Sequence, residues 1–253
     1  MNILTIEQEK KLKTILLTIG GKGGDGKTLV TAHVAEKLER ESVGVRAYDF
    51  EAGDGTGLSR FYAKAKKSKL GEQADLDELI DAIADSPSEQ VTVVDFPANS
   101  GDAFLKWVSE IDWADLRDVG IRFVVVLVLS DDGDSFALAE RWIQTLGDHV
   151  EYVTVFNEGR GKDFGAYRRS IVGMDFAHQY KPLEIRFPEI PQNLMLHIRN
   201  EGSTLFRALD EQTKQLTVTG LENKFMVKTR VVRLRKEIDN ALQPLVNLIS
   251  NGK

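Results

Sequence analysis

Residues 21–28 carry the clearest chemical signal in the sequence, because they fit the phosphate-loop pattern G-x-x-x-x-G-K-[ST]. The glycines allow backbone N–H groups to turn inward around an anion, and the N-terminus of a following helix adds partial positive charge. We expect the Lys27 ammonium to reach the β- and γ-phosphates and the Thr28 hydroxyl to hold Mg²⁺. The pattern therefore predicts a nucleoside triphosphate site, with a glycine-rich turn that binds nothing as the alternative.

The residues on both sides of this loop fit that prediction. Residues 14–19 are a short apolar run, partly β-branched, which is typical of a buried parallel strand. From Leu29 to Leu38, apolar residues recur at helical spacing, so a helix is expected to begin on the loop. This order of strand, loop and helix distinguishes a phosphate loop from a chance match to the pattern.

Two further predicted strands end in carboxylates. Residues 90–95 are expected to form a buried strand that closes with Asp95. Residues 44–50 are expected to form a second strand, which contains Asp49 and is followed by Glu51 and Asp54. Parallel α/β sheets place ligands at the carboxyl ends of their strands. Phosphate-loop hydrolases hold Mg²⁺ with a second acid on a neighbouring strand, so Asp95 is predicted to join Thr28 as a metal ligand. Capping of the following helix is the alternative role for Asp95.

Lys22 makes the loop more specific. Residues 22–28 read K-G-G-D-G-K-T, with a second lysine five residues before Lys27. This loop resembles that of the ParA/MinD family, which carries such a second lysine. The resemblance implies that Lys22 crosses a dimer interface to the nucleotide of the other subunit, and hence a homodimer when ATP is bound. A solvated loop lysine is the alternative. The resemblance assigns nucleotide contacts to Gly21, Lys22, Gly23, Gly24, Asp25, Gly26, Lys27, Thr28 and Leu29.

One residue within the loop departs from the family pattern. Asp25 occupies a position at which the family usually has a small or apolar residue. It places a negative charge near the phosphates, which is expected to weaken nucleotide affinity or to reposition Lys22.

The resemblance also assigns catalytic roles. Where the family usually shows D-x-D-P-Q, this chain has D-F-E-A-G from residue 49. The resemblance implies a catalytic set of Lys22, Lys27, Asp49 and Glu51, with Glu51 positioning the attacking water and Asp49 beside it. Asp54 is a third candidate for that role. Because glutamate is one methylene longer than aspartate, slow hydrolysis is expected.

Later segments resemble the parts of the family that surround the base. Asn157 follows the predicted strand at 152–156 and resembles the family's base-contacting asparagine, whose amide both donates and accepts. Residues 190–194, I-P-Q-N-L, resemble the segment that lines the base, which implies contacts from Pro191 and Asn193. The guanine-reading pattern N-K-x-D is absent, since E-G-R follows Asn157. The cofactors implied are therefore ATP, in preference to GTP, and Mg²⁺.

Strands alternate with helices along the rest of the chain. Residues 121–129 form the most hydrophobic predicted strand, expected near the centre of a sheet, and residues 183–188 are expected at its edge. Helices are predicted over 75–84, 101–118, 135–146, 194–209 and 224–249, with a glycine- and charge-rich loop after residue 156. The alternation predicts an α/β fold: a doubly wound, mostly parallel sheet with helices on both faces. No repeat or linker interrupts it, so we expect a single domain over residues 1–253 with a lead-in at 1–12.

Composition excludes several classes of protein. The 253 residues suffice for one α/β domain. The absence of cysteine excludes disulfides, thiolate metal sites and the iron–sulfur reductases that share this type of loop, and it favours the cytoplasm. No run of about 18 apolar residues is present, so no transmembrane segment is expected. With a net charge of -6 and a pI of about 5.4, nucleic-acid contact requires a local basic patch.

Residues 224–236 form such a patch. An apolar stripe from Val227 to Leu245 is expected to dock the helix on the body, leaving a cationic face suited to the phosphate backbone of DNA. A solvated face is the alternative. An anionic membrane surface is less favoured, since the stripe lacks the bulky aromatic residues that such helices prefer. The cations are Lys224, Lys228, Arg230, Arg233, Arg235 and Lys236.

These observations lead to one main hypothesis and two rivals. The main hypothesis is a Mg²⁺-dependent ATPase that dimerises around two ATP molecules. It would act as a DNA-associated switch in plasmid or chromosome partition or a related positioning process, with a partner protein that stimulates hydrolysis. The first rival is an ATP-dependent ligase of the dethiobiotin-synthetase type, which needs a small-molecule pocket beside the γ-phosphate. The second is a nucleotide-sensing interaction protein with little turnover, favoured by the altered acidic run.

Overall fold

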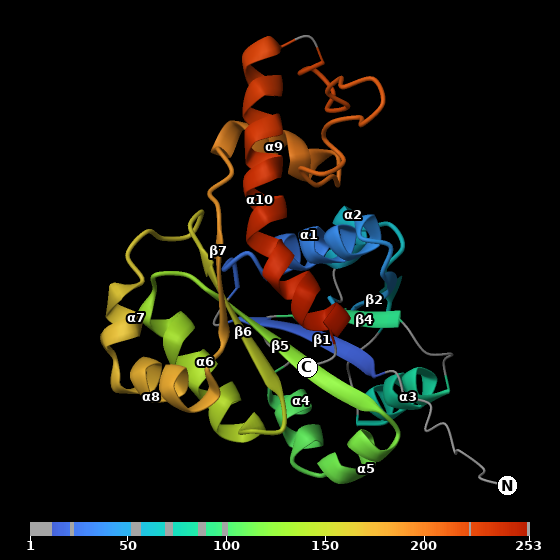
Figure 1. Cartoon of the computed structure of the whole chain (residues 1–253), viewed down its shortest axis with the longest axis vertical. Helices are drawn as coiled ribbons and strands as arrows, with labels where there is room; N and C mark the ends of the chain where they lie inside the picture. Colours follow the sequence, from blue (N-terminus) through green and yellow to red (C-terminus); the bar gives the residue numbers. More distant parts are fainter. Residues whose placement is uncertain are drawn as a thin grey trace, which may run out of the picture.

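The computed structural model describes residues 12–20, 23–51, 57–68, 73–85, 90–97, 101–222 and 224–251. Within them, seven strands form one sheet in the order β3-β2-β4-β1-β5-β6-β7, and every pair is parallel. The predicted doubly wound parallel sheet is thus confirmed (Figure 1). The strands are β1 (Lys13–Gly20), β2 (Gly44–Asp49), β3 (Lys66–Lys67), β4 (Gln90–Asp95), β5 (Ile121–Leu129), β6 (Glu151–Asn157) and β7 (Leu183–Phe187).

Helices cover both faces of the sheet, each over its own apolar cluster (Figure 1). One cluster takes side chains from α1 (Lys27–Arg40), α2 (Leu58–Phe61), α9 (Gln192–Asn200) and α10 (Phe225–Asn251). The other takes side chains from α3 (Gln73–Ala84), α4 (Gly101–Val108), α5 (Trp113–Asp118), α6 (Gly133–Leu146), α7 (Gly165–Arg169) and α8 (Ile171–Tyr180).

The central strands β1 and β5 read as apolar runs because both of their faces are buried. In β1, Ile15, Leu17 and Ile19 belong to one cluster and Leu16 to the other, as expected for side chains that alternate across a sheet. β5 lies between β1 and β6 inside the sheet, and β7 lies at an edge, as the sequence predicted.

The prediction of one helix over 101–118 was wrong. α4 ends at Val108 and α5 begins at Trp113. Between them, the Asp112 carboxylate accepts a hydrogen bond from the Ala114 N–H at 2.7 Å and caps the second helix. The apolar spacing continues across the break, whereas the cap starts a new helix.

The predicted helix over 194–209 is also shorter than expected, since α9 ends at Asn200. Gly202 follows with φ +56°, and a Cβ at that position would lie 2.3 Å from the Arg60 carbonyl oxygen. The chain therefore turns at a glycine that packs directly on another backbone. The apolar residues after it, Leu205 and Phe206, are buried in irregular chain.

The region after β6 is likewise more ordered than the predicted loop. Residues 158–164 remain irregular, but α7 and α8 follow. The Ser170 hydroxyl accepts a hydrogen bond from the Gly173 N–H at 3.0 Å and caps α8. Tyr167 and Phe176 bury their rings beneath these helices.

Helix α10 packs against β7 and α1 through the predicted stripe, and its N-terminal half extends beyond the sheet (Figure 1). The buried side chains of this stripe are Val231, Leu234, Ile238, Leu242 and Leu245.

Candidate nucleotide-binding site

The phosphate loop lies between the end of β1 and the start of α1. Gly24 and Gly26 have φ values of +99° and +95°, in the left-handed region that glycine adopts readily. Helix α1 begins at Lys27 without a side-chain cap, so its first N–H groups point towards the loop. Gly21 and Lys22 lie outside the described residues, and the roles predicted for them stay predictions.

The Lys27 side chain is held within the protein and is only 7% exposed. Its stem crosses the end of β1, where a Cβ on Gly20 would lie 2.8 Å from Lys27 Cγ. Burial lowers the pKa of Lys27, while the charges of Asp25, Asp95 and Glu51 act in the opposite direction. The structure therefore surrounds the predicted phosphate-binding cation with carboxylates.

Asp95 and Thr28, the two predicted metal ligands, are brought into direct contact. Asp95 Oδ2 accepts a hydrogen bond from Thr28 Oγ1 at 2.8 Å, and Asp95 Oδ1 accepts one from Thr31 Oγ1 at 3.2 Å. Burial raises the pKa of Asp95 to about 7, assisted by the charge of Asp49 and opposed by the hydrogen bond from Thr28. Asp49 is its neighbour because the two residues are in register on β2 and β4.

These two oxygen ligands suit Mg²⁺, which usually takes one or two protein oxygens and completes its shell with phosphates and water. Among the described residues, no group of three or more His, Cys, Asp or Glu side chains could hold a metal by itself. The donor set thus fits a metal that arrives with a phosphorylated ligand.

The carboxylates after β2 occupy different positions. Asp49 is fully buried and accepts hydrogen bonds from the Glu51 N–H at 3.0 Å and the Ser59 N–H at 2.8 Å, so it joins the end of β2 to the start of α2. Glu51 is half-buried and lines the cavity at the loop. Of the two, Glu51 is therefore the residue that faces the cavity. Asp54 lies outside the described residues.

A cavity of about 570 Å³ opens beside the loop. Two of the residues on its wall, Arg160 and Arg199, are cations that the sequence analysis did not assign to the site. Pro191 and Asn193, predicted to contact the base, are not among the lining residues, although their neighbour Gln192 is. The wall comprises Gly23, Gly24, Gly26, Lys27, Thr28, Leu29, Glu51, Phe61, Phe96, Pro97, Asn157, Gly159, Arg160, Phe187, Pro188, Glu189, Ile190, Gln192, Met195 and Arg199.

Asp25 and Asn157 meet beneath the loop. Asn157 Nδ2 donates a hydrogen bond to the Asp25 carbonyl oxygen at 2.6 Å, and Asn157 Oδ1 accepts one from the Gly159 N–H at 3.1 Å. The Asp25 carboxylate is buried and accepts a hydrogen bond from Ser135 Oγ at 3.1 Å. The one residue of the loop that departs from the family pattern therefore points into the protein, towards α6.

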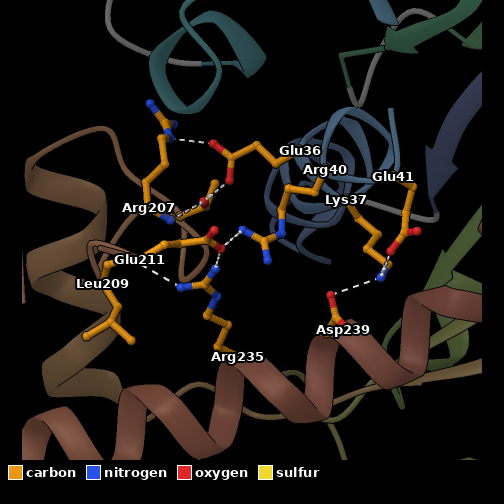
Figure 2. Close-up of polar contacts among 10 residues, drawn as sticks. Glu36, Lys37, Arg40, Glu41, Arg207, Leu209, Glu211, Arg235 and Asp239 are labelled. Carbon is orange, nitrogen blue, oxygen red and sulfur yellow. Dashed lines mark hydrogen bonds and ion pairs between the residues drawn. The ribbon is translucent and has the colours of Figure 1, made fainter. Parts of the chain in front are cut away.

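The far end of α1 is anchored by ion pairs (Figure 2). Lys37, only 2% exposed, binds the carboxylates of Glu41 at 2.7 Å and Asp239 of α10 at 2.9 Å. Because a buried cation that loses its partners costs roughly 3–5 kcal/mol, these contacts hold α1 against α10. The pair with Asp239 thereby fixes the C-terminal end of the helix that begins at the loop.

Arg235, predicted to lie on the basic face of α10, has a different orientation in the structure (Figure 2). Arg235 pairs with Glu211 and donates to the Leu209 carbonyl oxygen at 3.2 Å, so its charge is turned inward. Arg230 and Arg233 remain exposed. The cationic face is therefore smaller than the sequence predicted.

The N-terminal end of α10 differs from the predicted face in a second respect. Phe225 is 75% exposed and Met226 is 60% exposed beside the cations. The lack of aromatic residues on the buried stripe is thus no argument against a membrane surface at this end.

Known structures share this arrangement of sheet and helices. A chain of the MinC:MinD cell division protein complex of Aquifex aeolicus is similar in structure, with 18% identity and a TM-score of 0.52. The match covers 90% of this chain and 96% of that one. MinD cell division protein of the same organism matches 90% of this chain and 97% of its own, with 17% identity and a TM-score of 0.51. This chain has the MinD fold.

Sequence comparisons assign this chain to no family. No protein-family model and no curated protein matches the chain. Within the described residues, no helix is long and apolar enough to cross a bilayer.

Proposed function

We propose that this protein is a Mg²⁺-dependent ATPase that binds ATP in the cavity beside the phosphate loop. The observation that carries the proposal is the buried Lys27 ammonium at a glycine-rich helix N-terminus, next to the Thr28–Asp95 pair. The parallel sheet supports it, since open α/β sheets bind ligands at the carboxyl ends of their strands, where this loop lies. Bound with Mg²⁺, ATP would supply the reactive γ-phosphoryl group.

The residues of this chain would act through position and charge. The Lys27 ammonium and the loop N–H groups neutralise phosphate charge in a partly desolvated site, where such interactions are strong. The Thr28 hydroxyl and the Asp95 carboxylate would hold Mg²⁺. Glu51 lines the cavity and accepts a hydrogen bond from the attacking water, while the buried Asp49 keeps the Glu51 backbone in place.

Dimerisation around two ATP molecules forms the second part of the proposal. Lys22 of each subunit would contact the nucleotide of the other, because two facing triphosphates concentrate negative charge that a cation from each side relieves. Hydrolysis would then be coupled to dissociation of the dimer.

The exposed cations of α10 support the third part, which is association with DNA as a switch in partition or a related positioning process. Arg230, Arg233 and Lys236 are exposed on one segment of a protein whose net charge is -6. Such a face binds phosphate backbones without reading bases. A partner protein that stimulates hydrolysis would complete the cycle.

The exposed Phe225 and Met226 favour a second candidate for this face, an anionic lipid surface. Apolar side chains beside cations are typical of helices that lie in a membrane interface. Binding to duplex DNA and to vesicles with and without anionic lipid, measured in parallel, would decide between the two.

The primary test is nucleotide binding by a Lys27→Ala variant, titrated with a fluorescent ATP analogue. We expect affinity to be lost, because the phosphates lose their buried counter-charge. Lys64→Ala is the matched control, since the Lys64 side chain is 71% exposed and pairs with Glu39 on the surface. Unchanged affinity in the Lys27→Ala protein would remove the nucleotide site from the loop.

A further inference from the structure

We propose that Asn157 is a positioning residue that holds the phosphate loop in its binding conformation. Ser135 supports the same loop residue from a second side. The inference rests on the proposed function, because it concerns how the loop is prepared for a triphosphate.

The hydrogen bonds of Asn157 fix the orientation of its amide. The Asp25 carbonyl oxygen can only accept, so it must face the amide nitrogen, and the Gly159 N–H can only donate, so it must face the amide oxygen. Asn157 is 5% exposed, and both ends of its side chain contact backbone. One donor and one acceptor of the amide are therefore committed to the backbone of the loop and of the turn after β6.

The loop approaches this amide too closely for any residue but glycine. A Cβ on Gly26 would lie 2.3 Å from Asn157 Nδ2, and Gly26 has a φ of +95°. The Asn157 side chain therefore packs directly under the turn that presents the loop N–H groups. Contact and hydrogen bond together fix the loop to the end of β6.

The second anchor reaches the loop through the Asp25 side chain. The buried Asp25 carboxylate accepts a hydrogen bond from Ser135 Oγ at 3.1 Å, and Ser135 Oγ in turn accepts one from the Ser130 N–H at 3.3 Å. Ser135 is fully buried at the start of α6. One loop residue is thus held by its carbonyl from β6 and by its carboxylate from α6.

A loop held at two points keeps its conformation without phosphates. Nucleotide binding then loses less conformational entropy in ordering the backbone, which strengthens affinity. This gain does not depend on the base, because Asn157 acts on the triphosphate through the loop.

The test compares three ligands that share a triphosphate. ATP, inosine triphosphate and inorganic tripolyphosphate are titrated with Mg²⁺ into the wild type, Asn157→Ala and Ser135→Ala. We expect Asn157→Ala to weaken all three by a similar factor of about ten, corresponding to loss of one buried hydrogen bond. Ser135→Ala should weaken all three by a smaller common factor. A loss confined to ATP would overturn the inference and return Asn157 to base recognition.

A second measurement keeps the inference testable if the variants bind too weakly to compare. Amide hydrogen exchange of the protein without nucleotide is measured in wild type and Asn157→Asp, which removes the donor and keeps the side-chain shape. We expect faster exchange at residues 23–28 and unchanged exchange in α3, on the other side of the sheet. Unchanged exchange at residues 23–28 would overturn the inference. A wild type that binds none of the three ligands would instead refute the nucleotide site itself.

Discussion

His33 provides the sharpest stability prediction, because the fold accepts it only as a neutral imidazole. The ring is fully buried on α1, with Nδ1 facing the Leu29 carbonyl oxygen at 2.8 Å and Nε2 facing the Leu205 N–H at 3.2 Å. Nδ1 therefore carries the proton and Nε2 accepts. A second proton on Nε2 would oppose the Leu205 N–H and break the contact between α1 and the segment after α9.

The magnitude follows from the pKa. Burial lowers the pKa of His33 from 6.5 to about 4, with the charge of Arg207 acting in the same direction. The unfolded chain therefore binds the proton first as the pH falls. The stability contributed by neutral His33 is fully present above about pH 6.5 and lost by about pH 4. A difference of about 2.5 in pKa corresponds to about 3 kcal/mol, a large fraction of the roughly 5–15 kcal/mol of a typical domain.

The assay is urea unfolding of wild type and His33→Gln between pH 4 and pH 8. Glutamine can accept from the Leu205 N–H but does not titrate, so the difference in unfolding free energy between the two proteins should fall by about 3 kcal/mol between pH 7 and pH 4. Burial raises the pKa values of Glu36 and Asp95, whose neutral forms favour the folded state at low pH. Both groups are present in each protein, so the difference isolates His33.

His178→Gln supplies the control for exchanging a histidine for glutamine, since the His178 side chain is exposed and lies outside the core. The reasoning would be refuted if the difference in unfolding free energy between wild type and His33→Gln stayed constant from pH 4 to pH 8. A constant difference would mean that the fold accommodates protonated His33.

Three further predictions concern the proposed function. Glu51→Ala should retain ATP affinity and lower turnover at least tenfold in a phosphate-release assay, because Glu51 lines the cavity without holding the phosphates; turnover at the wild-type rate would contradict its role. Lys22→Ala should bind ATP nearly as the wild type does but fail to dimerise in sedimentation velocity with ATP and Mg²⁺, whereas dimerisation like that of the parent would exclude the shared site. Changing Arg230 and Arg233 together to Gln should weaken duplex DNA binding for every sequence and flatten its salt dependence, while Arg235→Gln should not, because the Arg235 side chain is 13% exposed and the Arg233 side chain, although paired with Glu237, is 69% exposed; an equal effect of both changes would mean that this face does not bind DNA.

The phosphate loop and the alternation of strands and helices could be predicted from the sequence because both are local properties. A loop that binds phosphate uses contiguous backbone N–H groups, so its glycines, Lys27 and Thr28 must be close in sequence. Strands buried on both faces are apolar throughout, so the inner strands could be predicted in their order along the chain, whereas the exposed edge strand β3 (Lys66–Lys67) was missed because it has no apolar residue. Asp95 could be placed beside Thr28 because parallel strands end at the same edge of the sheet.

The ends of helices were less predictable. The cap at Asp112 and the turn at Gly202 end regular structure within segments whose apolar spacing continues. A polar cap or a close backbone contact decides such boundaries, and neither changes the hydrophobic pattern.

The contacts of the side chains around the loop depend on the tertiary structure and could not be predicted from the sequence. Asn157 contacts Asp25 across 132 residues of sequence, and Ser135 contacts it across 110. Arg235 is removed from the cationic face by Glu211, on a segment with no regular structure of its own. Hydrogen bonds and ion pairs depend on distance and direction in space, and residue type and spacing specify these only for neighbours in sequence. The sequence thus predicted the kind of site, and the fold determined which side chains line the cavity and which hold the loop in place.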